Sequence, residues 1–115
     1  MEFLRRLIRR RNSVAPRTPL QLDYEDGTII VSDPGGDFNL RLNCSEIEEV
    51  WVEESRSFLG GVNSYIFVMR EGNSFLIHET DNGIESIAQS LSRDFGINLD
   101  FKLARERRLL YKRPT

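Results

Sequence analysis

The strongest constraint on the fold is a period of two in the hydrophobic pattern between residues 20 and 79. Leu20, Leu22 and Tyr24 alternate with polar residues, and the same alternation returns in residues 38–42. Alternation of this kind is typical of strands that bury one face. This part of the chain is therefore predicted to form a sheet.

Turn signals divide this region into six short strands. Glu25-Asp26-Gly27 predicts a tight turn, because an Asp-Gly pair tolerates positive φ. A second turn is expected at residues 33–37, and Glu71-Gly72-Asn73 joins two strands into the clearest hairpin.

A longer strand is predicted over residues 47–54, followed by a loop over residues 55–64. Ile47 is out of register with Val50 and Val52, so we expect a bulge near Glu48.

The period then changes to 3.6 residues, which predicts an amphipathic helix over residues 83–95. Its apolar face consists of Ile84, Ile87, Ala88, Leu91 and Phe95. Thr80, Asp81 or Asn82 can cap its start, and Gly96 is placed to end it. The tail has two interpretations: residues 97–103 alternate like a strand, whereas residues 100–108 could form a short helix. Residues 109–111 are expected to be extended.

The predicted fold class is α+β. We expect an antiparallel six- to seven-stranded curled sheet or partly open barrel, capped by one C-terminal amphipathic helix, with a short N-terminal amphipathic helix. A chain of 115 residues fits a single folded body. Its predicted parts are a basic helix and proline-containing linker (1–19), the β domain with its helix (20–96) and a basic tail packed on that domain (97–115).

The strand order, the Asp26-Gly27 hairpin, the 47–52 strand and the helix after the last strand carry a resemblance. The stretch from residue 24 to residue 95 resembles the pleckstrin-homology/GRAM-like barrel and small bacterial proteins of that type, with a tail similar to Leu110-Tyr111-Lys112-Arg113-Pro114. The resemblance implies a barrel fold. Lipid-binding members usually carry basic residues around the first hairpin, whereas this hairpin holds Asp23, Glu25 and Asp26.

The net charge of −2 hides a strong asymmetry: residues 1–20 carry +5, residues 21–100 carry −12 and residues 101–115 carry +5. Residues 1–11 are predicted to form a short helix with an apolar face and a basic remainder, which is typical of a membrane-surface anchor. The predicted membrane-surface residues are Phe3, Leu4, Arg5, Arg6, Leu7, Ile8, Arg9 and Arg10. The same segment could instead dock on its own acidic domain.

No catalytic motif stands out. His78 is the single histidine, and Ser74 on the same strand face is too far along the strand for contact. Cys44 has acidic neighbours, which favours a structural thiol, and one histidine with one cysteine argues against a zinc site. The Gly35-Gly36 and Gly60-Gly61 pairs lack the lysine of a phosphate loop. We expect no cofactor and no enzymatic activity.

The leading functional hypothesis is a non-catalytic binding module that engages a protein partner through an acidic barrel face. An inhibitory or immunity-like role is one form of it. A basic partner suits such a face, because charge sets encounter rate and specificity. The predicted contact residues are acidic positions of one strand and an apolar pair in the following loop: Glu48, Glu53, Glu54, Phe58 and Leu59.

The alternative is a peripheral membrane module that uses residues 1–11. No apolar run approaches the roughly 18 residues that a membrane span needs, and arginines interrupt the first apolar residues, which argues against a secretory signal. A cytoplasmic location is expected, either free or at the inner face of a membrane. The acidic body argues against nucleic-acid binding, and self-association through the oppositely charged parts stays open.

Overall fold

The computed structural model describes residues 19–36, 39–57 and 60–115. They form seven strands, one α-helix and one turn of 3-10 helix, so the α+β class is confirmed. In chain order these are β1 (Gln21–Glu25), β2 (Thr28–Ser32), β3 (Asn39–Asn43), η1 (Cys44–Glu46), β4 (Ile47–Ser57), β5 (Gly60–Met69), β6 (Ser74–His78), α2 (Ile84–Phe95) and β7 (Arg108–Lys112). The helix predicted for residues 1–11 lies outside the described residues.

The first sheet is an antiparallel meander in the order β1-β2-β3. The predicted Asp26-Gly27 turn is confirmed, with φ of 48° at Asp26 and 77° at Gly27. The next turn follows Asp33, whose carboxylate accepts the Gly35 N–H and whose carbonyl accepts the Gly36 N–H.

The second sheet is antiparallel in the order β6-β5-β4-β7. The expected irregularity near Glu48 is confirmed by a register shift between Ile47 and Glu49. The loop predicted for residues 55–64 is wrong, because β4 and β5 stay paired up to Ser57 and Gly60. This part of the strands is rich in small and polar residues and therefore lacks the hydrophobic alternation that predicts a strand.

In the described ranges the strands form two sheets of three and four strands, not one curled sheet, and they do not close into a barrel. The turn η1 separates them: the Asn43 side chain accepts the Ser45 N–H at its start, and the chain then turns into β4. Strand β4 has β5 on one edge and β7 on the other, so neither edge is left for β3.

Helix α2 begins one residue later than predicted and is capped differently. Its N-cap is Gly83, and no side chain caps it, so the prediction of Thr80, Asp81 or Asn82 as cap is wrong. The Asp81 carboxylate instead accepts the backbone N–H groups of Leu20 and His78. The predicted stop is confirmed, since Gly96 adopts φ of 68° and its N–H bonds to carbonyls of the last turn.

Helix α2 is not the last element, contrary to the expected capping helix after the final strand. Residues 97–107, called here the crossover segment, lead to β7. This last strand pairs with β4 along the edge opposite to β5. The extended segment predicted at residues 109–111 therefore belongs to a sheet. Its register shifts between Val50 and Trp51, because Tyr111 and Leu109 pair with these adjacent residues and Leu110 is extra.

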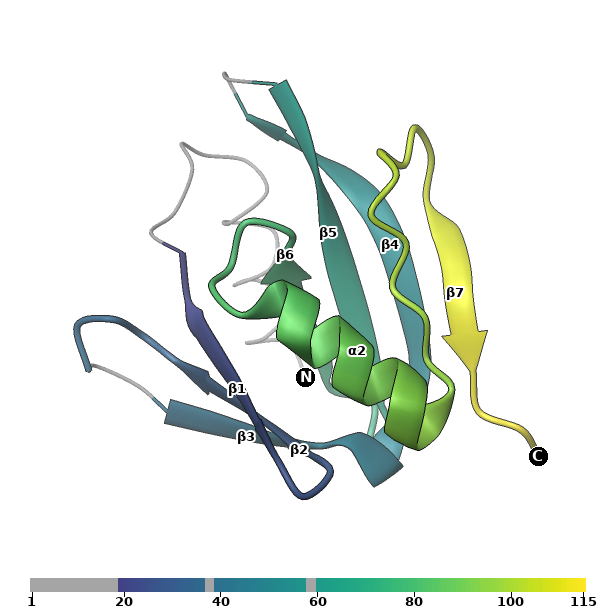
Figure 1. Ribbon diagram of the computed structural model, residues 1–115. Coiled ribbons are helices and arrows are strands. Elements are labelled where there is room, and N and C mark those ends of the chain that lie inside the picture. Colours follow the sequence, from purple (N-terminus) through teal and green to yellow (C-terminus); the bar gives the residue numbers. More distant parts are fainter. Residues whose placement is uncertain (1–18, 37–38, 58–59) are drawn as a thin grey trace.

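Both sheets and the helix share one core. Ile29 and Leu42 come from the first sheet, Tyr65 and Phe67 from the second, and Leu91 from α2. Figure 1 shows α2 lying across one side of the second sheet with β1 beside it. We call this side of the second sheet its inner face, and the opposite side its outer face. The crossover segment adds Ile97, Leu99 and Ala104 to the core.

Candidate functional site

The three glutamates predicted to contact a partner do not share one face. Successive residues of β4 point to opposite sides, so Glu53 lies on the outer face and Glu54 on the inner face, in the pair with Asn63. Glu48 lies at the bulge and forms an ion pair with Arg113, with 3.4 Å between Arg113 Nε and Glu48 Oε2. The single acidic barrel face is therefore not formed by this set.

The other predicted contact residues lie outside the described part of the chain. These are the apolar pair of the β4–β5 connection and the residues of the first helix: Phe58, Leu59, Phe3, Leu4, Arg5, Arg6, Leu7, Ile8, Arg9 and Arg10. Their assignment as contact residues stays a prediction.

His78 has a serine neighbour that sequence reasoning missed. Ser64 on β5 is paired with His78 across the ladder, and its Oγ lies 2.8 Å from His78 Nδ1. Ser55 Oγ on β4 contacts Ser64 Oγ in turn. A serine nucleophile needs access to its substrate, but Ser64 is fully buried and His78 is 8% exposed. The row of Ser55, Ser64 and His78 therefore provides buried polar groups of the sheet with hydrogen-bond partners.

Cys44 is also poorly placed to act as a nucleophile. Its side chain is buried, and that burial raises the pKa of the thiol to about 11. The thiol therefore stays protonated at neutral pH and supplies no thiolate. Within the described ranges, no set of three or more His, Cys, Asp or Glu side chains is arranged to hold a metal ion.

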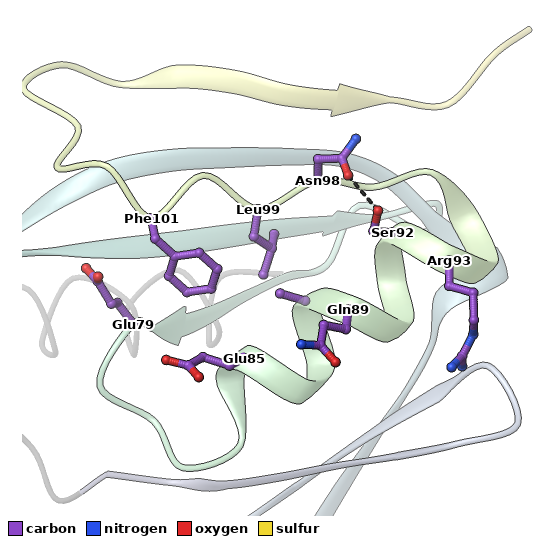
Figure 2. A pocket seen from close by; sticks show the side chains of 9 residues that line it. Glu79, Glu85, Gln89, Ser92, Arg93, Asn98, Leu99 and Phe101 are labelled. Carbon is purple, nitrogen blue, oxygen red and sulfur yellow. Dashed lines mark hydrogen bonds between the residues drawn. The ribbon is translucent and has the colours of Figure 1, made fainter.

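A groove of about 810 Å³ runs between α2 and the crossover segment, and we call it the α2 groove. Its walls are formed by polar and apolar side chains of both segments and by the residue after β6: Glu79, Glu85, Ala88, Gln89, Ser92, Arg93, Asn98, Leu99 and Phe101. Figure 2 shows Glu79, Glu85 and Phe101 toward one end, with Ser92 and Asn98 toward the other. Ser92 Oγ donates to Asn98 Oδ1 at 2.7 Å.

The crossover segment is held beside the helix by buried anchors. Ile97 is fully buried. Tyr65 Oη donates to the Asp100 carbonyl at 2.7 Å. The Asn63 side-chain amide donates to the carbonyls of Asp100 and Lys102 and accepts the Ala104 N–H. These contacts fix the backbone on both sides of Phe101.

Phe101 is a large apolar side chain on the surface of this groove. It is 39% exposed and meets Tyr65 edge to face, with 5.9 Å between ring centroids. Glu79 lies at the same end, and its Oε1 accepts the Asn63 N–H at 2.9 Å. The groove thus combines an accessible aromatic ring with the carboxylates of Glu79 and Glu85. The sequence showed the alternation of residues 97–103 but not which of its apolar residues stay exposed.

No protein-family model, curated protein or solved structure matches this chain. None of the helices in the described part of the chain has the length and apolar character needed to cross a bilayer.

Proposed function

We propose that this protein is a non-catalytic binding module, and that the α2 groove holds a segment of a partner protein. The observation that supports this function most strongly is the exposed Phe101 beside two carboxylates. Aromatic side chains on a rigid support are frequent anchors of protein interfaces. The buried contacts of Asn63 and Tyr65 hold the backbone around Phe101 in place.

The chemistry of the groove specifies the partner segment. Phe101, Leu99 and Ala88 offer an apolar surface, and Glu79 and Glu85 add negative charge at one end. A segment with an apolar side chain followed by a lysine or arginine would match both. The acidic charge of residues 21–100 would speed the approach of such a basic partner. An inhibitory role, in which the module masks a basic region of its partner, is one form of this function.

The structure suggests a different contact set from the one predicted on β4. Glu53 lies on the outer face, away from the α2 groove, and Glu48 already forms an ion pair with Arg113, so neither is part of the contact set in the groove. The pleckstrin-homology/GRAM-like resemblance also stays a proposal. Two antiparallel sheets with a helix against their shared core support it, and the strand that follows α2 departs from it.

The test is capture of partners from the native cell extract by the full chain and three variants. Glu85→Lys reverses a charge in the groove, and Phe101→Ser removes its aromatic surface. Glu71→Lys is the matched control, since Glu71 is exposed in the β5–β6 turn. A specific partner should bind wild type and the control and should bind both groove variants at least about tenfold more weakly.

Calorimetry with the purified partner measures that difference, and circular dichroism checks that each variant is folded. A partner that binds both groove variants as tightly as wild type would rule out the α2 groove. Failure of every captured protein to distinguish the groove variants from the control would do the same.

A further inference from the structure

The outer face of the second sheet carries a second apolar surface. The alternation of side chains and the register of the strands place four large apolar side chains in one row across the sheet. These are Leu76 on β6, Ile66 on β5, Trp51 on β4 and Leu109 on β7. Val68 extends this row along β5, and Ser64 separates Ile66 from Val62 on the same face. By contrast, the outer face of the first sheet pairs Asp23, Ile30 and Arg41, which is a solvent-facing composition.

Two residues of this row are buried without being part of the core. Ile66 is 7% exposed and Leu76 is 4% exposed, yet neither belongs to the core cluster. Their inner-face neighbours Tyr65, Phe67 and Ile77 pack in that cluster with the helix. In the part of the chain that the structure describes, α2 and the first sheet lie on the inner side (Figure 1). The outer row needs a layer of its own.

We propose that this layer is the chain's own N-terminal segment, residues 1–18. The apolar face predicted for that segment comprises Phe3, Leu4, Leu7 and Ile8, which provides a complementary stripe for the row of Ile66 and Leu76. The proposal concerns an intramolecular docking surface and is independent of the partner site in the α2 groove.

The position of Leu20, near the start of the described residues, supports residues 1–18 as the covering layer. The Leu20 N–H bonds to Asp81 Oδ1 at 2.9 Å, and the Leu20 carbonyl accepts the Asn82 N–H. Asp81 follows β6 closely and its Oδ2 accepts the His78 N–H. The N-terminal segment is therefore attached at the end of β6, which is an edge strand of the second sheet.

The length of the segment also suffices. A linker of eight residues spans at most about 26 Å when extended, and a four-stranded sheet is about 14 Å wide from first to last strand. A helix of eleven residues is about 16 Å long. A helix at residues 1–11 can therefore lie across the outer face without strain in the linker.

Charge favours the same arrangement. Residues 1–18 hold six arginines and one glutamate, whereas residues 21–100 carry a net charge of −12. On the outer face itself, β4 contributes Glu49 and Glu53, beside Trp51. Basic residues on the β7 side have the opposite sign: Arg107, just before β7, stacks on Trp51 at 4.9 Å, and Lys112 lies opposite Glu49 in the strand register. The arginines are thus expected on the β4 side of the segment, away from β7.

Docking of this kind would withhold the segment from membranes. The four apolar side chains cannot lie against the sheet and insert into a lipid surface at the same time. The full chain is therefore expected to bind anionic vesicles weakly until the segment is released from the sheet.

Trp51, the single tryptophan, is a built-in probe because it lies on the outer face. In the full chain, Leu4→Asp with Leu7→Asp should shift its emission to longer wavelength and raise its quenching by acrylamide at least about twofold. Asn12→Asp with Ser13→Asp is the matched control, since it adds the same charge to the same segment outside the apolar face. Circular dichroism confirms that both double variants keep their sheets.

A second measurement does not depend on disrupting the contact. Asn12→Cys carries a spin label, while the buried Cys44 stays unlabelled. Docking predicts that the label broadens the methyl signals of Ile66 and Leu76 more than that of Ile29 in the first sheet.

Three results would overturn the proposal. The first is a Trp51 signal that is the same in wild type and in the Leu4→Asp, Leu7→Asp variant, with no selective broadening. The second is exposure of Trp51 that depends on protein concentration, which would make a second copy the covering layer. The third is tight binding of wild type to phosphatidylserine vesicles with Trp51 unchanged, which would assign the apolar face to lipid.

Discussion

At the scale of single residues, the clearest electrostatic link joins the first sheet to the end of α2. Tyr24 Oη donates to Asp94 Oδ2 at 2.5 Å, and Arg93 bonds to the same carboxylate. The hydrogen bonds from Arg93 and then Tyr24 lower the pKa of Asp94 to about 2. Burial, and then the bond to Asp94, raise the pKa of Tyr24 to about 12.

This link predicts a pH dependence of stability at the acid end. A carboxyl with a lowered pKa stabilises the fold above its ordinary value of 3.8, and this contribution is lost as the pH falls toward about 2. Asp94→Asn should therefore be less stable than wild type at neutral pH, and the difference should shrink over that interval. Urea unfolding at a series of pH values measures it.

The matched control for this measurement is Asp23→Asn, on the exposed outer face of the first sheet. This substitution at an exposed position should change the free energy of unfolding at neutral pH by less than about 0.5 kcal/mol. A difference between Asp94→Asn and wild type that stays constant down to the lowest pH would contradict the assignment.

At the scale of elements, the start of α2 depends on a glycine more than on a capping side chain. Gly83 has φ of 92°, and a Cβ there would lie 2.5 Å from the carbonyl oxygen of Leu22. Strand β1 runs this close because the backbone N–H of Leu22 bonds to the Asn82 carbonyl and Gln21 forms a parallel bridge with Asn82. The helix start and the first strand are therefore one packed unit.

Gly83→Ala should destabilise the protein by about 2 to 4 kcal/mol, because it adds backbone strain and a clash with backbone atoms that cannot move aside. Gly36→Ala is the control: Gly36 has φ of 78° but nothing within 4 Å of its missing Cβ. The free energy of unfolding of that control should fall by only about 1 kcal/mol. If chemical denaturation showed the same loss of unfolding free energy for both variants, the close approach of β1 to Gly83 would not contribute to the cost.

At the scale of the whole molecule, one buried amide connects parts that are far apart in sequence. Asn63 is fully buried on β5, and the hydrogen bonds of its side-chain amide go to the backbone of residues 100–104. It holds the crossover segment, which forms one wall of the α2 groove and delivers β7 to the edge of β4. Fold and candidate site thus depend on the same contact.

Asn63→Ala should cost about 2 to 4 kcal/mol, because it leaves the Lys102 carbonyl and the Ala104 N–H without their partner, while the Asp100 carbonyl keeps the bond from Tyr65 Oη. It should also raise amide hydrogen exchange in β7 while the rest of the second sheet stays protected. Asn39→Ala, at an exposed position of β3, should change neither. Unchanged exchange in β7 would show that its own pairing with β4 is sufficient to hold it.

The elements with local signals could be predicted from the sequence. The Asp26-Gly27 turn, the bulge near Glu48 and the stop at Gly96 follow from backbone preferences of neighbouring residues. The period of 3.6 residues predicted a helix over residues 83–95, because it places the apolar side chains on one face, and α2 occupies residues 84–95.

The pairing of the strands and the contacts between surfaces could be read only from the folded structure. The split into two sheets follows from β7 taking the free edge of β4, a contact between distant parts of the chain. The Ser64–His78 pair, the Asn63 contacts and the groove beside Phe101 depend on register and on the path of the crossover segment. Such contacts join residues many positions apart, so no local pattern encodes them.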